Sequence, residues 1–267
     1  MSTETSADQH EEGAVLLEQR ASVAIITLSR PAALNALTWA MYQQLETHLK
    51  RLAADDTTRA VILRGEGKAF AAGTDIQQFQ GFNGEQGIAY EHKLEAIIEG
   101  LYTFPKPTIA AIHGYAVGGG LVVASVCDLR YATPSSRFGV PIARTLGNCL
   151  SHKNYQHLVD AFGAMRTKEM LFTGRLLKTP DALQCGFLTE MTDEEQLMPR
   201  VIEIAQQISA LAPLTIWATK EAQRRLNAAR GDALDFDDVV ARVYSSADFA
   251  EGVRAYLEKR KPDWRGQ

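Results

Sequence analysis

The sequence predicts a mixed α/β fold that continues into a helical C-terminal region. Short apolar runs without polar alternation, over 60–65 and 107–114, are typical of strands that are covered on both faces. Helical patterns separate these runs, and helical patterns alone dominate the later part of the chain. We therefore expect a disordered tail over 1–13, an α/β core over 14–200 and a helical region over 201–267.

The first elements are predicted from apolar spacing. Two β-rich runs within residues 15–29 are separated by polar residues 18–22, which we expect to form a hairpin turn. Pro31 ends the second run because it has no N–H to donate to a neighbouring strand. A helix is predicted over 35–52, with Thr38 as its N-cap, because apolar residues recur every three to four positions at Leu37, Met41, Leu45, Leu49 and Leu52.

The later elements are mostly helical. We expect a helix over 88–102, preceded by a mobile loop over 81–87, and a strand over 128–132. Further helices are predicted over 165–172, 181–186, 194–211 and 213–229.

Composition limits the classes of function. The 267 residues contain 28 Lys and Arg against 32 Asp and Glu, a net charge of −4, which argues against attraction of the whole protein to nucleic acid or to anionic membranes. Cys127, Cys149 and Cys185 are too few and too widely spaced for a disulfide framework or a zinc site, so we expect no metal. The acidic N-terminus resembles no targeting peptide, and we expect a cytoplasmic protein that binds neither nucleic acid nor membrane.

Two glycine turns are the strongest local signals. They span 68–76 and 114–121, where a strand is expected to lead into a helix. Consecutive glycines permit positive φ and let backbone N–H groups approach a ligand closely. Two converging N–H groups form an oxyanion hole, which stabilises a thioester carbonyl as it gains negative charge. The alternative is that Gly118-Gly119-Gly120 only allows close helix packing; the spacing of a phosphate-binding loop is absent.

Six ordered sequence blocks carry a family resemblance. They are ITLSRPAALNAL (26–37), GKAFAAGTDI (67–76), KPTIAAIHGYAVGGGLVVASVCDLRYA (106–132), RFGVP (137–141), TGRLLKTPDALQCGF (173–187) and FAEGVRAYLEKRKPDW (249–264). With them the chain resembles the crotonase superfamily, the enoyl-CoA hydratase/isomerase family. The resemblance implies a crotonase-like spiral of repeated ββα units and a C-terminal helical region that forms homotrimers, often as dimers of trimers. It also implies an acyl-CoA substrate, as in fatty acid metabolism, with coenzyme A as part of the substrate and no separate cofactor.

The resemblance also implies site residues. Carried over by position, the oxyanion hole consists of the backbone N–H groups of Thr74 and Gly119. The coenzyme A portion is expected to lie across two segments and near two lysines, which together supply Arg30, Ala32, Ala33, Leu34, Ala72, Asp75, Ile76, Lys220 and Lys259.

The sequence departs from the family at two positions. Hydratases use two glutamates, and the corresponding residues here are Val122 and Ile142. No Asp or Glu occurs between Glu99 and Asp128, or between Asp128 and Asp160, so a shift of register does not restore either acid. Hydration needs a base for water and an acid for the α-carbon, so the standard mechanism looks unavailable.

Other polar residues are candidates for the acyl pocket. Arg144 is a candidate binder of an anionic acyl group, whereas Asn148, Cys149 and His152 follow it in the same segment. Cys149 is a nucleophile only if a base such as His152 activates it, and a buried inert thiol is the alternative. Glu91 and Glu95 are candidate acid or base groups on the segment that covers the acyl pocket in the family, unless they are solvated.

Three interpretations of function follow. The first is an acyl-CoA isomerase, lyase or hydratase-like enzyme that stabilises a thioester enolate with non-standard acid or base residues. The second is a thioester hydrolase or a decarboxylase that uses the same oxyanion hole. The third is a non-catalytic acyl-CoA-binding protein, which the two missing carboxylates favour.

Overall fold

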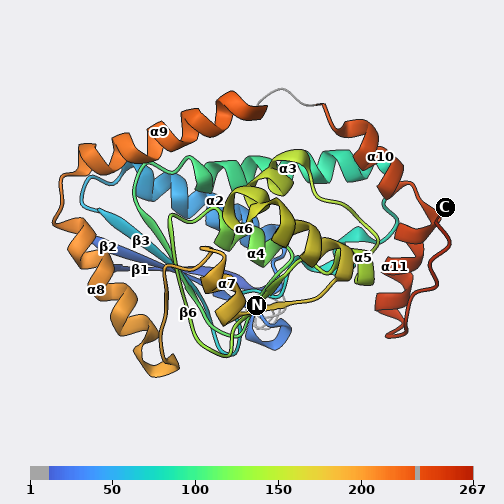
Figure 1. Cartoon of the computed structure of the whole chain (residues 1–267), viewed down its shortest axis with the longest axis horizontal. Coiled ribbons are helices and arrows are strands. Elements are labelled where there is room, and N and C mark those ends of the chain that lie inside the picture. The colour runs from blue at the N-terminus through green and yellow to red at the C-terminus, as the bar shows by residue number, and fades with distance from the viewer. Residues whose placement is uncertain (1–11, 232–234, 267) are drawn as a thin grey trace, which may run out of the picture.

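The fold has a central sheet with helices on both of its faces (Figure 1). It is taken from a computed structural model that describes residues 12–231 and 235–266. The tail expected over 1–13 lies outside the described residues except for Glu12 and Gly13.

The central sheet has six strands in the order β1-β2-β3-β4-β6-β9. Its β1 pairs antiparallel with β2, and all its other pairs are parallel. A smaller sheet has the order β5-β7-β8. The strands are β1 (Ala14–Arg20), β2 (Val23–Ser29), β3 (Ala60–Gly65), β4 (Thr108–Ile112), β5 (Tyr115–Val117), β6 (Leu129–Ala132), β7 (Arg137–Gly139), β8 (Leu177–Lys178) and β9 (Glu190–Met191).

Helices connect the strands and then make up the C-terminal region. The α-helices are α2 (Trp39–Ala54), α3 (Gly84–Tyr102), α4 (Gly119–Ser125), α5 (Ile142–Thr145), α6 (His152–Thr173), α7 (Thr179–Gln184), α8 (Leu197–Ser209), α9 (Pro213–Gly231), α10 (Asp237–Tyr244) and α11 (Ala247–Leu257). Short 3-10 helices are η1 (Pro31–Ala33), η2 (Ile76–Phe79) and η3 (Glu194–Gln196).

The central strands bury side chains on both faces, as their continuous apolar runs predict. Ile26 and Leu63 belong to the larger core, which also contains the apolar face of α2. Ile25 and Ile62 point to the opposite face and pack in a second core with Val201 of α8. The mixed α/β fold and the helical C-terminal region predicted from the sequence are confirmed.

The start of α2 follows the expected capping chemistry. The Thr38 hydroxyl accepts a 3.2 Å hydrogen bond from the Met41 N–H, which confirms Thr38 as the N-cap. The helix begins at Trp39, later than the predicted position 35, because Asn35 has a positive φ of 58°. Its side-chain amide instead donates to the Glu66 and Ala69 carbonyls.

Two local expectations need correction. The turn predicted over 18–22 contains only Ala21 and Ser22, because residues 18–20 extend the edge strand β1. The prediction of a mobile loop over 81–87 is wrong for residues 84–87, because α3 begins at Gly84 with a capping box between Asn83 and Gln86.

The glycines at the start of α3 allow another helix to approach. A Cβ at Gly87 would lie 2.3 Å from Cγ of Tyr244 in α10, and one at Gly84 would lie 2.4 Å from the Ser245 hydroxyl. Glycine is therefore required here for packing, whereas the sequence pattern associates it with loops.

The C-terminal helices run around the outside of the core (Figure 1). α8 packs on the sheet, α10 packs on α3, and α11 packs on η2. The last two helices thus lie at the end of the molecule where the glycine turns are found. Among the described residues, no single helix is long and apolar enough to cross a membrane, although α8 with η3 and α9 pass that test as a pair bent by 104°.

Candidate active site

The two glycine turns lie side by side. The Ala71 N–H donates to the Tyr115 carbonyl at 2.9 Å, and the Val117 N–H donates back to the Ala71 carbonyl at 3.0 Å. Beyond this bridge the chain turns at Gly73, with φ of 114°, and at Gly118, with φ of 53°. These backbone conformations favour glycine, and they bring residues 73–74 next to residues 118–119.

The backbone N–H groups of Thr74 and Gly119 are close to each other. A Cβ at Gly119 would lie 3.7 Å from the Thr74 nitrogen and only 2.5 Å from the Tyr42 hydroxyl oxygen. Within residues 12–231 and 235–266, neither N–H has a hydrogen-bond acceptor. The Thr74 hydroxyl is held at 2.9 Å by Tyr42 and at 3.4 Å by Tyr90. The arrangement leaves two neighbouring donors available to a ligand.

Both turns line a pocket of about 550 Å³, which we call the main pocket. One end is formed by η1 and the residues before η2, and the other end is mostly apolar. The apolar end includes Phe79, Leu94, Val122, Val140, Ile142, Leu146 and Leu150.

The main pocket includes most of the residues expected at the coenzyme A portion. Arg30, Ala32, Ala33, Leu34, Ala72, Asp75 and Ile76 line one end of it. The Arg30 guanidinium lies 2.8 Å from the Asp75 carboxylate, and both side chains are largely buried. This ion pair therefore joins the loop after β2 to the first glycine turn in the lining of the main pocket.

The two lysines expected to contact phosphate lie elsewhere. Lys220 forms an ion pair with Asp128 and donates to the Lys106 carbonyl at 3.0 Å, on a different cavity. Asp128 in turn accepts a hydrogen bond from the Thr108 N–H at 2.7 Å. Lys259 follows α11 in an exposed position and does not line the main pocket.

The acid and base candidates separate into two groups. Glu91 and Asn148 line the main pocket, together with the apolar residues Val122 and Ile142. Arg144, Cys149, His152 and Glu95 are not part of its lining.

Each candidate outside the main pocket has another environment. Arg144 is exposed and lies beside Gly174, while Glu95 pairs with Lys153 at 3.6 Å. Burial raises the pKa of the Cys149 thiol to about 12, which makes the inert interpretation of this cysteine the better one. His152 borders a smaller cavity behind the main pocket.

Glu91 is the buried carboxyl group of the main pocket. It is only 2% exposed, and each of its oxygens accepts a hydrogen bond. The Tyr244 hydroxyl donates to Oε1 at 2.7 Å, and the Ser151 N–H donates to Oε2 at 2.8 Å. Burial raises the pKa of Glu91 to about 7, although the bonds from Tyr244 and Ser151 act in the opposite direction. A carboxyl group with such a pKa both gains and loses a proton near neutral pH.

Three tyrosines of the site were not predicted from the sequence. Tyr42, Tyr90 and Tyr244 come from α2, α3 and α10, and their hydroxyls bond to Thr74 or Glu91. Their spacing along the chain carries no motif. Only the position of Tyr90 next to Glu91 is a local signal.

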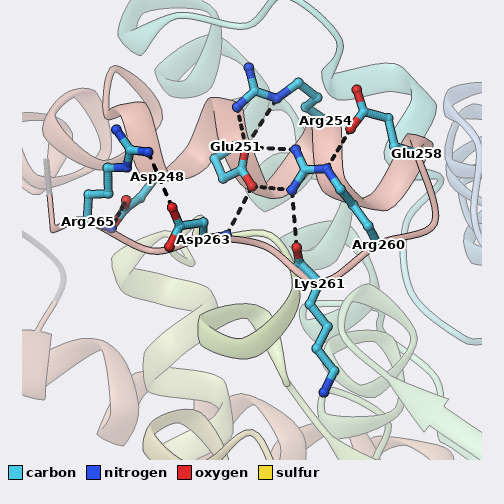
Figure 2. Close-up of polar contacts among 8 residues, drawn as sticks. All are labelled: Asp248, Glu251, Arg254, Glu258, Arg260, Lys261, Asp263 and Arg265. Atoms are coloured by element: carbon cyan, nitrogen blue, oxygen red, sulfur yellow. Dashed lines mark hydrogen bonds and ion pairs between the residues drawn. The ribbon is translucent and has the colours of Figure 1, made fainter.

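The C-terminal helix α11 forms one wall of the main pocket. Tyr256 lines the pocket, and a Cβ at Gly252 would lie 2.2 Å from the Leu146 carbonyl oxygen. Figure 2 shows how Glu251 of this helix is held by Arg254 and Arg260. Glu251 also accepts from the Asp263 N–H at 3.0 Å, so the segment after α11 is fastened back onto the helix. The two guanidinium groups hold the pKa of Glu251 well below its ordinary value.

Among the described residues, no group of three or more His, Cys, Asp and Glu side chains is placed to hold a metal ion.

Comparison with known proteins agrees with this architecture. The chain is 32% identical over 250 residues to the short-chain-enoyl-CoA hydratase of Clostridium acetobutylicum, a match that covers 92% of this chain and 95% of that protein. The structure of methylmalonyl-CoA decarboxylase in complex with 2-nitronate-propionyl-CoA is 31% identical, with a TM-score of 0.87, and the match covers 95% of this chain and 98% of that one. An enoyl-CoA hydratase/carnithine racemase from Magnetospirillum magneticum is 32% identical, with a TM-score of 0.77, over 95% of this chain and 96% of that one.

These likenesses and the paired glycine turns define a protein of the crotonase fold. A model of the family described as enoyl-CoA hydratase/isomerase matches residues 18–267. The chain belongs to the enoyl-CoA hydratase/isomerase family.

Proposed function

We propose that this chain is an acyl-CoA enzyme that transfers a proton at the carbon next to a thioester carbonyl. The N–H groups of Thr74 and Gly119 stabilise the enolate, and Glu91 is the single acid–base group. The observation that carries the proposal is a buried carboxyl group in the same pocket as two backbone donors that have no acceptor among the described residues. The relatives support the substrate class, because one solved structure of similar fold is a complex with a CoA compound.

The backbone donors account for the choice of a thioester. Removing a proton from its α-carbon places negative charge on the carbonyl oxygen, and a preorganised N–H donor at that oxygen lowers such a barrier by about 3 kcal/mol. The Arg30–Asp75 end of the main pocket is the proposed site of the coenzyme A portion, so the acyl chain extends toward Val122 and Ile142.

A single acid–base group favours isomerisation over hydration. Hydration of a 2-enoyl thioester needs two groups at once, and the two positions that would supply them are apolar. Isomerisation of a 3-enoyl thioester needs only one. The Glu91 carboxylate takes a proton from the α-carbon to give a dienolate, and the resulting carboxylic acid returns that proton to the γ-carbon to give the 2-enoyl thioester.

Decarboxylation is the second candidate. It is favoured by the TM-score of 0.87 to methylmalonyl-CoA decarboxylase and by the apolar lining at Val122 and Ile142. An apolar wall destabilises a substrate carboxylate relative to neutral CO₂. Loss of CO₂ leaves a thioester enolate at the α-carbon, which the carboxylic acid form of Glu91 then protonates.

The test is a substrate panel assayed with the wild-type chain, Glu91→Gln and Glu85→Gln. Glu85 is exposed in the first turn of the same helix, so its variant is a matched control. We expect 3-enoyl-CoA to be converted to the conjugated 2-enoyl-CoA, with a loss of about 10²- to 10⁴-fold in Glu91→Gln and no loss in Glu85→Gln.

The panel also separates the alternatives. Release of CO₂ from methylmalonyl-CoA without isomerisation would favour the second candidate, and release of free thiol would favour a hydrolase. Full isomerase activity in Glu91→Gln, or binding of every CoA ester without turnover, would overturn the proposal.

A further inference from the structure

A second cavity lies behind Glu91, which we call the side cavity. It has a volume of about 180 Å³ and is bordered by α3, by the start of α6 and by the chain leading into α10. Comparison of the two linings shows that, within the described part of the chain, Glu91 is the one residue that they share. Glu91 therefore borders both the main pocket and the side cavity.

The side cavity leads to the protein surface. His92 and Asp237 border it with side chains that are 58% and 44% exposed. Glu91 itself is buried, and it borders two cavities through which water can approach it. A substrate bound in the main pocket would occupy that side, and only the side cavity would remain.

The walls of the side cavity carry polar side chains that can hydrogen-bond to water. His152 and Glu95 both border it, and an imidazole ring and a carboxylate offer such groups. Lys153, which forms an ion pair with Glu95, also borders the side cavity. Among the described residues, the titratable groups around Glu91 include His92 and Glu95 on α3, His152 and Lys153 on α6, Asp235 and Asp237 at α10, and Tyr244 at the end of α10. Tyr42 on α2, Tyr90 beside Glu91, and Cys149 complete this set.

We propose that the side cavity is the route by which Glu91 exchanges its proton with solvent while substrate fills the main pocket, with His152 as a positioning residue of that route. This rests on the proposed role of Glu91 in proton transfer. The ligand of the cavity is water, or a small neutral base of similar size, that passes a proton between Glu91 and the surface.

The proposal makes the fate of the substrate proton depend on the side cavity. After Glu91 takes a proton from the α-carbon, that proton is either returned to the γ-carbon or lost to solvent. A blocked side cavity slows the loss but leaves the return unchanged. The fraction of label retained in the product therefore reports on the cavity, and kcat reports on the chemistry.

The experiment uses 3-enoyl-CoA with both α-hydrogens replaced by deuterium, converted in ordinary water. Retention is the deuterium found at the γ-carbon of the 2-enoyl product by mass spectrometry of its fragments. In His152→Phe, which fills the side cavity, we expect retention to rise severalfold while kcat stays near the wild-type value. Unchanged retention in a folded His152→Phe protein, or complete retention already in the wild type, would overturn the proposal.

A second variant keeps the test independent of added bulk. His152→Ala opens the side cavity, and added imidazole is expected to lower retention in this variant but not in the wild type. No response to imidazole would count against the route. Full isomerase activity in Glu91→Gln would instead overturn the proposed function, so the two failures are distinguishable.

Discussion

The hydroxyl of Tyr244 in α10 donates a 2.7 Å hydrogen bond to Oε1 of Glu91 in α3. The two residues are 153 positions apart in the chain, and both are buried. Asn148 donates to the same hydroxyl oxygen at 3.3 Å, which orients the tyrosine O–H toward the carboxyl group. The C-terminal region thus supplies a direct contact to the acid–base group proposed for the reaction.

Replacement of Tyr244 by Phe is expected to shift the pH profile of the reaction. The Tyr244 hydrogen bond lowers the pKa of Glu91 against the effect of burial, so its loss raises that pKa further above about 7. A bond of about 1 to 1.5 kcal/mol corresponds to about one pKa unit. The acid limb of kcat/KM, where the carboxylate is required, therefore moves to higher pH by about one unit. Tyr115→Phe, on the exposed end of β5, is the control, and an equal loss at every pH would contradict the prediction.

The stability of Glu91→Gln relative to the wild type is expected to depend on pH. In the folded chain the pKa of Glu91 is about 7, above the ordinary value of 4.5, so the carboxyl group becomes destabilising as it ionises. As pH rises from about 4.5 to about 7, the variant gains stability over the wild type, by up to about 3 kcal/mol. Urea unfolding across this range measures the difference, and a constant difference would refute the prediction.

Gly119→Ala is expected to lower kcat strongly while a matched glycine replacement does not. A Cβ at Gly119 would lie 2.5 Å from the Tyr42 hydroxyl and 2.7 Å from the Thr74 hydroxyl, so the two turns must move apart. Loss of one oxyanion donor costs about 10²- to 10³-fold in kcat. The matched variant is Gly100→Ala, at an exposed position of α3, where an added Cβ would meet no atom within 4 Å. This variant is expected to keep full activity, with the free energy of unfolding raised by up to about 1 kcal/mol from helix propensity. Equal activity of the two variants would count against the proposed donors.

The double variant Val122→Glu, Ile142→Glu is expected to hydrate crotonyl-CoA faster than the parent chain. Both positions line the main pocket, and the two carboxylates are the groups that hydration requires. The measurement is loss of the enoyl thioester absorbance, with circular dichroism to verify folding because Val122 is buried. The double Gln variant is the control, since amides of the same size do not act as bases. No gain over that control would mean that the pocket has the wrong shape for the added water.

The parts predicted well from the sequence are those fixed by local pattern. The strands at 60–65 and 107–114 were predictable because both faces are buried, which leaves no polar alternation. The second glycine turn was also predictable from a local pattern, because Gly118 adopts a positive φ that favours glycine. Val122 and Ile142 follow that turn and β7 at fixed distances, and both do line the main pocket.

The parts that were missed or left open depend on contacts between distant segments. Glu91 and Glu95 were both candidates on a helix whose sequence looks polar, and only the packing of α10 and the Ser151 N–H makes Glu91 the buried carboxyl group. Lys220 was expected at a phosphate, but its partner Asp128 is 92 residues away and no local pattern links the two. The homotrimer or dimer of trimers and the cytoplasmic location stay predictions.

The Glu251 contacts in Figure 2 also bear on the order in which the site is completed. Tyr256 contributes to the main pocket, and its helix is fastened by Arg260 and by the Asp263 N–H. During synthesis the sheet and both glycine turns emerge from the ribosome long before these residues. A nascent chain that ends before residue 260 therefore has the backbone donors but lacks the groups that hold the wall supplied by Tyr256, so the donors are in place before that wall is.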